Sequence, residues 1–290
     1  MTIMHKIAKL LPIRPSDAHK GNCGRVGIIA GSASMLGAGI LTALAALKTG
    51  SGLVYLMTVK EAVPWINIQY PELIVFPLPS KNGFITSKAW SIIKKNIELN
   101  QINTLAIGPG LGHNKEIKDL VQKILQYLDQ NNSIPTVLDA DALKVITANK
   151  LRQFKNLKLV LTPHPKEFEL LFECFPKTKE DILTLAQEAA ENIGQVIILK
   201  GQESIVARPK EIEVNPTGNP GMATAGAGDV LTGIVASLIG QGLEGFEAAV
   251  LGTYLHGLAG DLGAEKQTMY SLTALDIIAF LPFAFKSLVN

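Results

Sequence analysis

The sequence predicts an α/β protein in which a mostly parallel sheet is covered by helices on both faces. Short apolar runs alternate with helical patterns from residue 25 to residue 200, and a repeated strand and helix unit makes neighbouring strands parallel. Runs such as 26–30 and 196–199 are apolar throughout, which is typical of strands that helices cover on both sides.

Each element follows from this alternation. The expected strands of the parallel region cover residues 25–30, 53–58, 73–76, 103–107, 135–139, 158–161 and 195–199. After residue 200 the pattern changes to a hairpin, with strands at 204–208 and 211–214 on either side of Pro209-Lys210. Three helices then follow at about 227–241, 245–263 and 273–285. Because neither a linker nor an internal repeat divides the chain, we expect a single domain over residues 1–290.

The composition narrows the class of ligand. Of 290 residues, 47% are hydrophobic and 18% charged, which excludes a disordered chain, and a net charge of +2 without a basic block argues against nucleic acid. The two cysteines lie far apart and show no metal-ligand spacing. There is no secretory signal and no apolar stretch of roughly 20 residues, so the sequence predicts a cytoplasmic protein that does not bind membranes. A small molecule is the expected ligand.

Glycine and polar residues follow five of the expected strands directly. Parallel strands present their carboxyl ends at one edge of a sheet, where ligands of open α/β sheets bind. These residues are Gly31-Ser32, the glycine-rich segment 108–112, Asp139-Ala140-Asp141, Thr162-Pro163-His164 and Lys200-Gly201. The sequence therefore predicts the site at this edge.

The densest motif runs from residue 215 to residue 229 and opens a helix. Its glycines allow several backbone N–H groups to point at one spot, and the helix dipole adds positive potential there, so the motif predicts an anion site. Asp229 would serve simply as a helix N-cap in a plain turn, but a cap does not require Gly221, Gly226 and Gly228 just upstream.

A carboxylate beside an anion hole suits phosphoryl transfer to a hydroxyl group. The hole stabilises charge on the transferred group while Asp229 orients the hydroxyl and takes its proton. The helix N-terminus is expected to lower the pKa of Asp229, which makes orientation more important than basicity.

The loop and several other segments resemble a known family. The end of the loop, Gly226-Ala227-Gly228-Asp229, resembles the signature of the ribokinase-like superfamily, a group of three-layer α/β folds with a mostly parallel central sheet. Gly218-Asn219-Pro220-Gly221-Met222-Ala223-Thr224 is similar more specifically to the NAD(P)H-hydrate dehydratases. Further matching segments bring the resemblance to roughly residues 10–285, and they lie at 19–21, 31–32, 37–38, 108–112, 138–143, 161–168, 199–201 and 256–261.

The resemblance implies a repair reaction on hydrated nicotinamide cofactors. The S epimer of NADHX or NADPHX would be phosphorylated on its ring hydroxyl by ADP or ATP with Mg²⁺, and loss of phosphate would restore NAD(P)H. It also implies a homotetramer, and a separate epimerase acting upstream, since the epimerase domain often fused ahead of this family is not expected here. A small-alcohol kinase of the same superfamily, such as a hydroxyethylthiazole or hydroxymethylpyrimidine kinase of thiamine precursors, is the alternative.

The resemblance also assigns roles to individual residues. Asp229 would be the base, and Gly226, Ala227 and Gly228 the anion hole, with Ala227 standing where many relatives have Thr. The hydrated dinucleotide would contact Asp229 together with Ala38, Gly112, His164 and Asn219. The adenine nucleotide would contact Lys200, Gly201, Gln202, Glu203, Ser204 and Gly228. Glu167 would reach Mg²⁺ through water.

Several of these residues also have purely structural interpretations. Lys200 suits a snorkelling lysine, His164 a solvated loop residue, and Glu167 a helix first-turn carboxylate. Asp141 is expected to cap a helix while Asp139 faces the phosphates, and the two are less suited to a two-metal site. His256 and Asp261 are expected to serve helix packing, with His256 close to the nucleotide.

Overall fold

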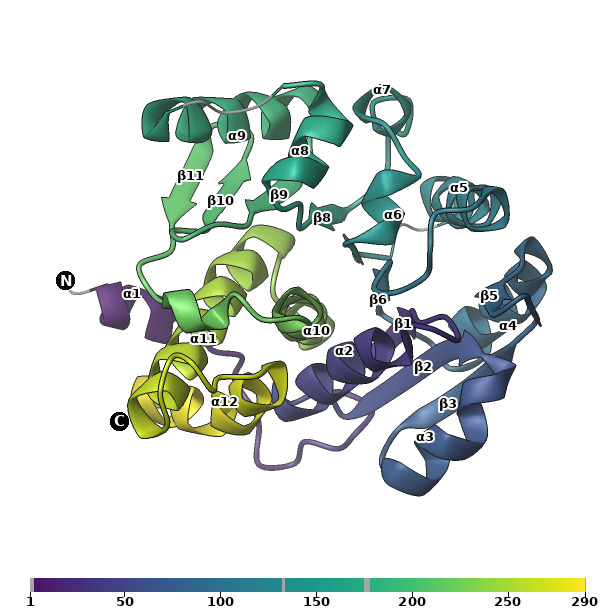
Figure 1. Ribbon diagram of the computed structural model, residues 1–290, viewed down its shortest axis with the longest axis horizontal. Coiled ribbons are helices and arrows are strands. Elements are labelled where there is room, and N and C mark those ends of the chain that lie inside the picture. The colour runs from purple at the N-terminus through teal and green to yellow at the C-terminus, as the bar shows by residue number, and fades with distance from the viewer. Residues whose placement is uncertain (1–2, 132–133, 175–177, 290) are drawn as a thin grey trace.

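The computed structural model describes residues 3–131, 134–174 and 178–289 and contains one large mixed sheet. The sheet has nine strands in the order β11-β10-β9-β8-β7-β6-β1-β2-β3 (Figure 1). Its strands are β1 (Arg25–Ile29), β2 (Leu53–Val59), β3 (Ile74–Leu78), β6 (Thr104–Ile107), β7 (Thr136–Leu138), β8 (Leu159–Leu161), β9 (Val196–Leu199), β10 (Ile205–Arg208) and β11 (Glu211–Val214). This arrangement confirms the predicted α/β class.

In the large sheet, the seven neighbouring strands β3, β2, β1, β6, β7, β8 and β9 are parallel. Strands β10 and β11 continue the sheet as an antiparallel hairpin. In the register at the centre, Val26 of β1 pairs with Val54 on one side and with Thr104 on the other. From β1 the chain first builds β2 and β3 on one side and then crosses to β6 on the other. The order therefore reverses between β1 and β6, which is where open α/β sheets form a ligand crevice.

Helices cover both faces of the sheet, as the apolar strands require. Figure 1 shows α10 and α11 on one side of the strands from β6 to β10, and α5, α8 and α9 on the other. The helices are α1 (Ile3–Ala8), α2 (Leu36–Lys48), α3 (Val63–Gln69), α4 (Trp90–Leu99), α5 (Lys115–Gln130), α6 (Asp141–Lys144), α7 (Ala148–Leu151), α8 (Pro165–Phe172), α9 (Lys179–Ile193), α10 (Ala227–Gly240), α11 (Gly245–Lys266) and α12 (Ala274–Val289). Every residue of β6, β7 and β8 is buried. None of the helices in the described part of the chain is both long and apolar enough to cross a membrane.

Helices α2 and α10 pack unusually closely. A β-carbon on Gly233 of α10 would collide with the backbone carbonyl of Thr42 in α2, so only glycine permits this approach. The starts of the two helices both lie at the carboxyl edge of the strands. The close packing therefore fixes these two helix starts relative to each other.

The structure differs from the sequence prediction near residue 75. Strand β3 continues to Leu78 and includes Pro77, which an edge strand tolerates because its outer side needs no hydrogen-bond donor. A small hairpin follows, formed by β4 (Ser80–Lys81) and β5 (Phe84–Ile85). Its turn residues Asn82 and Gly83 both have positive φ, as the Asn-Gly hairpin turn requires. That dipeptide was the sequence signal that our prediction missed.

Candidate active site

The candidate active site lies at the carboxyl edge of the parallel strands, beside the reversal of strand order. Helix α10 packs between α2 and α11, and its first turn faces this edge (Figure 1). The loops that leave β1, β6, β7, β8 and β9 converge here. The predicted location is thus built by segments that are far apart in the chain.

The first turn of α10 has the geometry of an anion hole. Gly226 is the N-cap and has φ +89°, and no side chain caps the helix. The amide of Ala227 donates to Thr224 at 3.4 Å, and the amide of Val230 donates to the carbonyl of Gly226 at 3.1 Å. The amides of Gly228 and Asp229 lie between these two and precede the first helical hydrogen bond. Such amides bind anions at helix N-termini.

Asp229 is the third residue of α10, so the simple N-cap interpretation is wrong. Its pKa is raised to about 7, first by burial and then by the nearby charge of Asp139, while Lys200 acts in the opposite direction. The expected lowering by the helix N-terminus is therefore also wrong, because desolvation and a second carboxylate outweigh it. A carboxylate with this pKa accepts a proton near neutral pH.

A cavity of about 680 Å³ opens beside this turn. Most of the predicted nucleotide residues line it, and so do His164 and Asn219 of the predicted substrate set. The nucleotide residues on its wall are Lys200, Gly201, Gln202, Ser204 and Gly228, and Ala227 lines it as well. Glu203 instead lines a neighbouring cavity of about 490 Å³ on the other side of the same loop. The cavity is therefore bounded by the start of α10 and the loop after β9.

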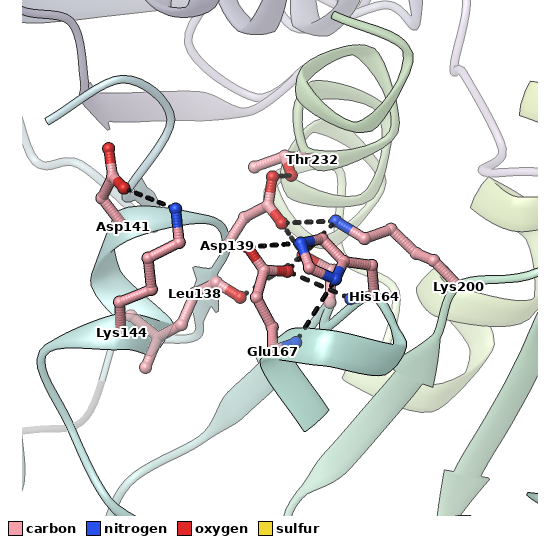
Figure 2. A network of polar contacts seen from close by, with 9 residues as sticks. Leu138, Asp139, Asp141, Lys144, His164, Glu167, Lys200 and Thr232 are labelled. Atoms are coloured by element: carbon pink, nitrogen blue, oxygen red, sulfur yellow. Dashed lines mark hydrogen bonds and ion pairs between the residues drawn. The ribbon is translucent and has the colours of Figure 1, made fainter. Parts of the chain in front are cut away.

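Lys200 is a partly buried cation on the wall of this cavity. Its Nζ donates to Asp139 Oδ1 at 2.8 Å and lies 4.0 Å from Glu167 Oε2 (Figure 2). Burial lowers the pKa of Lys200, but the surrounding carboxylates, Asp139 first, outweigh burial and raise it. Lys200 is therefore charged and held in place, and the snorkelling interpretation does not apply.

His164 and Glu167 form a capping box at the start of α8. His164 Nδ1 accepts from the amide of Glu167 at 3.3 Å, and Glu167 Oε2 accepts from the amide of His164 at 3.1 Å. The ring Nε2 lies 3.3 Å from Glu167 Oε1. Burial lowers the pKa of His164, although the charge of Glu167 opposes this. The first-turn interpretation of Glu167 is thus correct, and the cap holds His164 on the cavity wall.

Ala38 and Gly112 lie outside the cavity, towards β1 and β6. Ala38 is in the first turn of α2, and a β-carbon on Gly110 would lie 3.0 Å from the β-carbon of Ala38. The amide of Gly112 donates to Asp141 Oδ2 at 2.8 Å, and Asp141 Oδ1 accepts from Lys144 at 2.9 Å. The structure therefore brings Ala38 and the glycine loop together, separately from the nucleotide set.

The two predicted roles of Asp139 and Asp141 need correction. Asp141 is the first residue of α6 and holds the Gly112 loop instead of capping the helix. Asp139 is 1% exposed, accepts hydrogen bonds from three protein donors and lines neither of the two cavities beside the site, so it does not face a phosphate directly. Figure 2 shows that Asp141 points away from Asp139, so the two carboxylates do not converge on a two-metal site.

Comparison with known proteins identifies the family. The family model described as NAD(P)H-hydrate dehydratase matches residues 26–282. This chain belongs to the NAD(P)H-hydrate dehydratase family. The dehydratase chain is 37% identical over 261 residues to the ADP-dependent (S)-NAD(P)H-hydrate dehydratase of Neisseria meningitidis, with 87% of this chain and 81% of that protein covered. The predicted resemblance is therefore confirmed.

Two further relatives extend this result. The dehydratase chain is 40% identical over 282 residues to the bifunctional NAD(P)H-hydrate repair enzyme Nnr of Moorella thermoacetica, covering 96% of this chain and 52% of that protein. It thus spans about half the length of the first curated relatives. A crystal structure of the ADP/ATP-dependent NAD(P)H-hydrate dehydratase of Bacillus subtilis, co-crystallised with ATP and Mg²⁺, superposes with a TM-score of 0.82 at 26% identity. It covers 98% of this chain and 97% of that one. A ribokinase-like superfamily protein from Enterococcus faecalis superposes with a TM-score of 0.85 at 26% identity, covering 99% of this chain and 95% of that one, which confirms the ribokinase-like fold.

The dehydratase site suits a metal ion that retains its water. In the described part of the chain, no three His, Cys, Asp or Glu side chains gather as a metal-binding group. Both oxygens of Glu167 already have partners within its capping box. A carboxylate of this kind fits contact through water, which is how Mg²⁺ is commonly held when phosphates supply its other ligands.

Two residues of α11, His256 and Asp261, support the candidate site in ways that the sequence indicated only in part. Asp261 of α11 accepts from the amide of Gly218 and from Asn219 Nδ2, both at 2.9 Å. It thereby fastens the loop that carries Asn219 to the cavity wall. His256 Nε2 lies 2.9 Å from the carbonyl of Ala227, and burial lowers the pKa of His256 to about 4, so the neutral ring donates there. The sequence signal was the spacing of His256 and Asp261 on one helix, which we had assigned to packing.

Proposed function

We propose that this chain catalyses the ADP- or ATP-dependent dehydration of the S epimer of NADHX and NADPHX to NADH and NADPH. The observation that carries the proposal is the first turn of α10. There Asp229, with a pKa of about 7, directly follows Ala227 and Gly228, which line a cavity together with a glycine-rich loop and the partly buried Lys200. This arrangement suits transfer of a phosphoryl group to a substrate hydroxyl.

In the first step, the ring hydroxyl attacks the terminal phosphorus of the nucleotide. The bond between that phosphorus and the bridging oxygen breaks, and Asp229 orients the hydroxyl and takes its proton. The amides of Gly228 and Asp229 stabilise the charge on the transferred group, and Lys200 balances the charge on the departing nucleotide. Gly226 permits the turn because its φ of +89° would strain any other residue.

In the second step, phosphate leaves the ring. The lone pair of the ring nitrogen forms a carbon–nitrogen double bond as the phosphate leaves with the electrons of the carbon–oxygen bond. Water then takes a proton from the adjacent ring carbon, and the carbon–hydrogen electrons restore the dihydronicotinamide. A phosphate leaves far more readily than a hydroxide, so nucleotide cleavage drives the elimination. The anion hole that accepted the transferred group holds it as it leaves, and a single site therefore serves both steps.

The remaining predicted contacts keep their proposed roles. Ala38 and Gly112 would contact the dinucleotide on the side of β1 and β6, with His164 and Asn219 at the cavity wall. Gly201, Gln202, Glu203 and Ser204 would hold the nucleotide from the loop after β9, with the backbone amides of the anion hole compensating for Ala227. Bound Mg²⁺ would neutralise charge on the phosphate oxygens, with Glu167 reaching it through water.

The assembly and location belong to the same proposal. We expect residues 1–290 to act as one dehydratase domain in the cytoplasm. Exposed apolar residues, among them Trp65 and Ile68 of α3, suit the buried subunit faces of the expected homotetramer.

The proposal is tested by supplying NADHX, Mg²⁺ and either ADP or ATP and following the absorbance of the reduced nicotinamide. Recovery of the signal, together with release of phosphate, is the expected result. The variant Asp229→Asn serves as the control and should bind nucleotide normally without turnover. Absence of recovery, together with stable phosphorylation of a thiazole or pyrimidine alcohol, would favour the thiamine-precursor kinase.

A further inference from the structure

Asp139 accepts three hydrogen bonds, although it lines neither of the two described cavities beside the site. It is 1% exposed and directly follows β7. Its Oδ1 accepts from Thr162 Oγ1 at 2.7 Å and from Lys200 Nζ at 2.8 Å, while its Oδ2 accepts from Thr232 Oγ1 at 2.8 Å (Figure 2). These donors come from the end of β8, the end of β9 and the middle of α10. One side chain therefore connects the elements that build the site.

The partner of Asp139 is the principal cation of the cavity. Among the described residues that line the 680 Å³ cavity, Lys200 is the single lysine or arginine. A β-carbon on Gly228 would lie 3.3 Å from Lys200 Nζ, so the ammonium borders the anion hole directly. Within the described structure, the carboxylates within 4.0 Å of this ammonium are Asp139 and Glu167, and Asp229 is not one of them.

We propose that Asp139 is a positioning residue that holds Lys200 at the edge of the anion hole and prevents it from pairing with Asp229. The inference deepens the proposed function, on which it rests. A lysine that paired with Asp229 would block the base and would be drawn away from the nucleotide. Lys200 pairs with Asp139 and not with Asp229, because the hydroxyl groups of Thr162 and Thr232 hold the Asp139 carboxylate in place beside the ammonium.

The electrostatics of Asp229 support this arrangement. After burial, Asp139 is the largest cause of its raised pKa, Lys200 opposes the rise, and Asp141 adds to it. These are the charged groups that face Asp229. Replacing Asp139 by Asn removes a negative charge and also frees Lys200 to turn towards Asp229, and both changes favour the ionised form of Asp229.

The test is a titration of the Asp229 carboxyl carbon by ¹³C NMR in the absence of any ligand, with the resonance assigned by its loss in Asp229→Asn. In Asp139→Asn we expect the midpoint to fall by at least about one pH unit from its wild-type value. In Lys200→Met we expect the opposite shift, since the lost cation favoured ionisation. An unchanged midpoint in Asp139→Asn, or shifts of the same sign in both variants, would overturn the proposal.

A second variant addresses the risk that Asp139→Asn does not fold. Asp139→Glu keeps the charge and the ion pair but displaces the carboxylate by one methylene, so Lys200 should move from its place beside the anion hole. We expect kcat to fall at least about tenfold while the Kd for ADP changes less than about threefold. Equal losses in kcat and in ADP affinity, or full activity, would contradict a positioning role. Because the titration needs no substrate, it remains decisive even if the NADHX assay fails.

Discussion

At the scale of single residues, the site places a carboxylate where it is costly to ionise. Asp229 has a folded-state pKa of about 7, well above the value of an exposed aspartate. The unfolded chain releases this proton at lower pH than the folded chain does. The contribution of Asp229 to folding stability therefore decreases as pH rises from about 4 to about 7, and its ionised form lowers stability at neutral pH.

This leads to a prediction for Asp229→Asn, which cannot ionise. The variant should be inactive, yet its Tm relative to the wild type should rise by several degrees between about pH 4.5 and about pH 8. Thermal unfolding measured across that range checks it. A difference in Tm that does not vary with pH would show that Asp229 titrates normally. In that case the folded protein would not be destabilised by the ionised carboxylate of Asp229 at neutral pH.

A second prediction concerns Lys200, whose removal leaves Asp139 buried without its cation. Lys200→Met should lower the free energy of unfolding by about 3 kcal/mol, because an unpaired buried charge is strongly destabilising. Denaturant unfolding measures this change. The double variant Lys200→Met with Asp139→Asn is the matched control and should recover part of the loss. If the double variant is less stable than the single one, the pair does not act as a unit.

At the scale of elements, α11 packs closely against the loop that carries Asn219. A β-carbon on Gly260 would collide with the side chain of Met222, and one on Gly257 would lie 2.6 Å from the carbonyl oxygen of Thr217. Together with the two hydrogen bonds to Asp261, these contacts seat residues 217–222 on the helix. The loop therefore forms a wall of the cavity whose position depends on α11.

The corresponding prediction uses Asp261→Ala. Losing two hydrogen bonds to a charged acceptor should release the loop and raise the KM for nucleotide by about tenfold, with a smaller effect on kcat. Steady-state kinetics with the nucleotide varied provide the measurement. Asp129→Ala is the control, since Asp129 also accepts two hydrogen bonds, from the amides of Lys155 and Asn156, at the C-terminal end of α5. Equal effects of both changes would mean a general loss of stability.

The sequence predicts an element well when the pattern that identifies it lies within a few neighbouring residues. Strands such as β1 and β9 were predictable because burial on both faces leaves an uninterrupted apolar run, and α10 because its glycine loop marks the helix start. Strand β3 was predicted only in part, since an edge strand admits Pro77 and partly exposed positions. The contacts of Asp139 could not be predicted. Its partners Thr162, Lys200 and Thr232 are distant in sequence and meet only through the fold.

The candidate site shows the same limit. The motif identified Asp229 as chemically important, but the direction of its pKa depends on burial and on Asp139, which local sequence does not reveal. Likewise, Ala38 and the loop ending at Gly112 lie close together, as expected for one ligand surface, whereas their separation from the nucleotide cavity required the packing of α2 against α10.

At the scale of the whole molecule, the low net charge agrees with how the site is expected to bind anions. The chain carries a formal charge of +2, and the phosphates would meet backbone amides and one buried ammonium. Long-range attraction to a basic surface contributes little to such a site, and salt screens buried groups weakly.

We therefore predict a weak dependence of nucleotide binding on ionic strength. Raising NaCl from about 50 mM to about 200 mM at constant Mg²⁺ should change the Kd for ADP by less than about threefold. Isothermal titration calorimetry at the two salt concentrations checks this. A tenfold or greater weakening would indicate that exposed basic side chains provide most of the affinity.

The contact of Gly233 with Thr42 has a consequence for the proposed binding surface. Since α2 and α10 cannot slide past each other, the span between Ala38, where the dinucleotide is expected, and the amides of Gly228 and Asp229 is set by the scaffold. A ligand that contacts both Ala38 and these amides must match that span. The packing of the two helices therefore sets the distance between the two ends of the proposed binding surface.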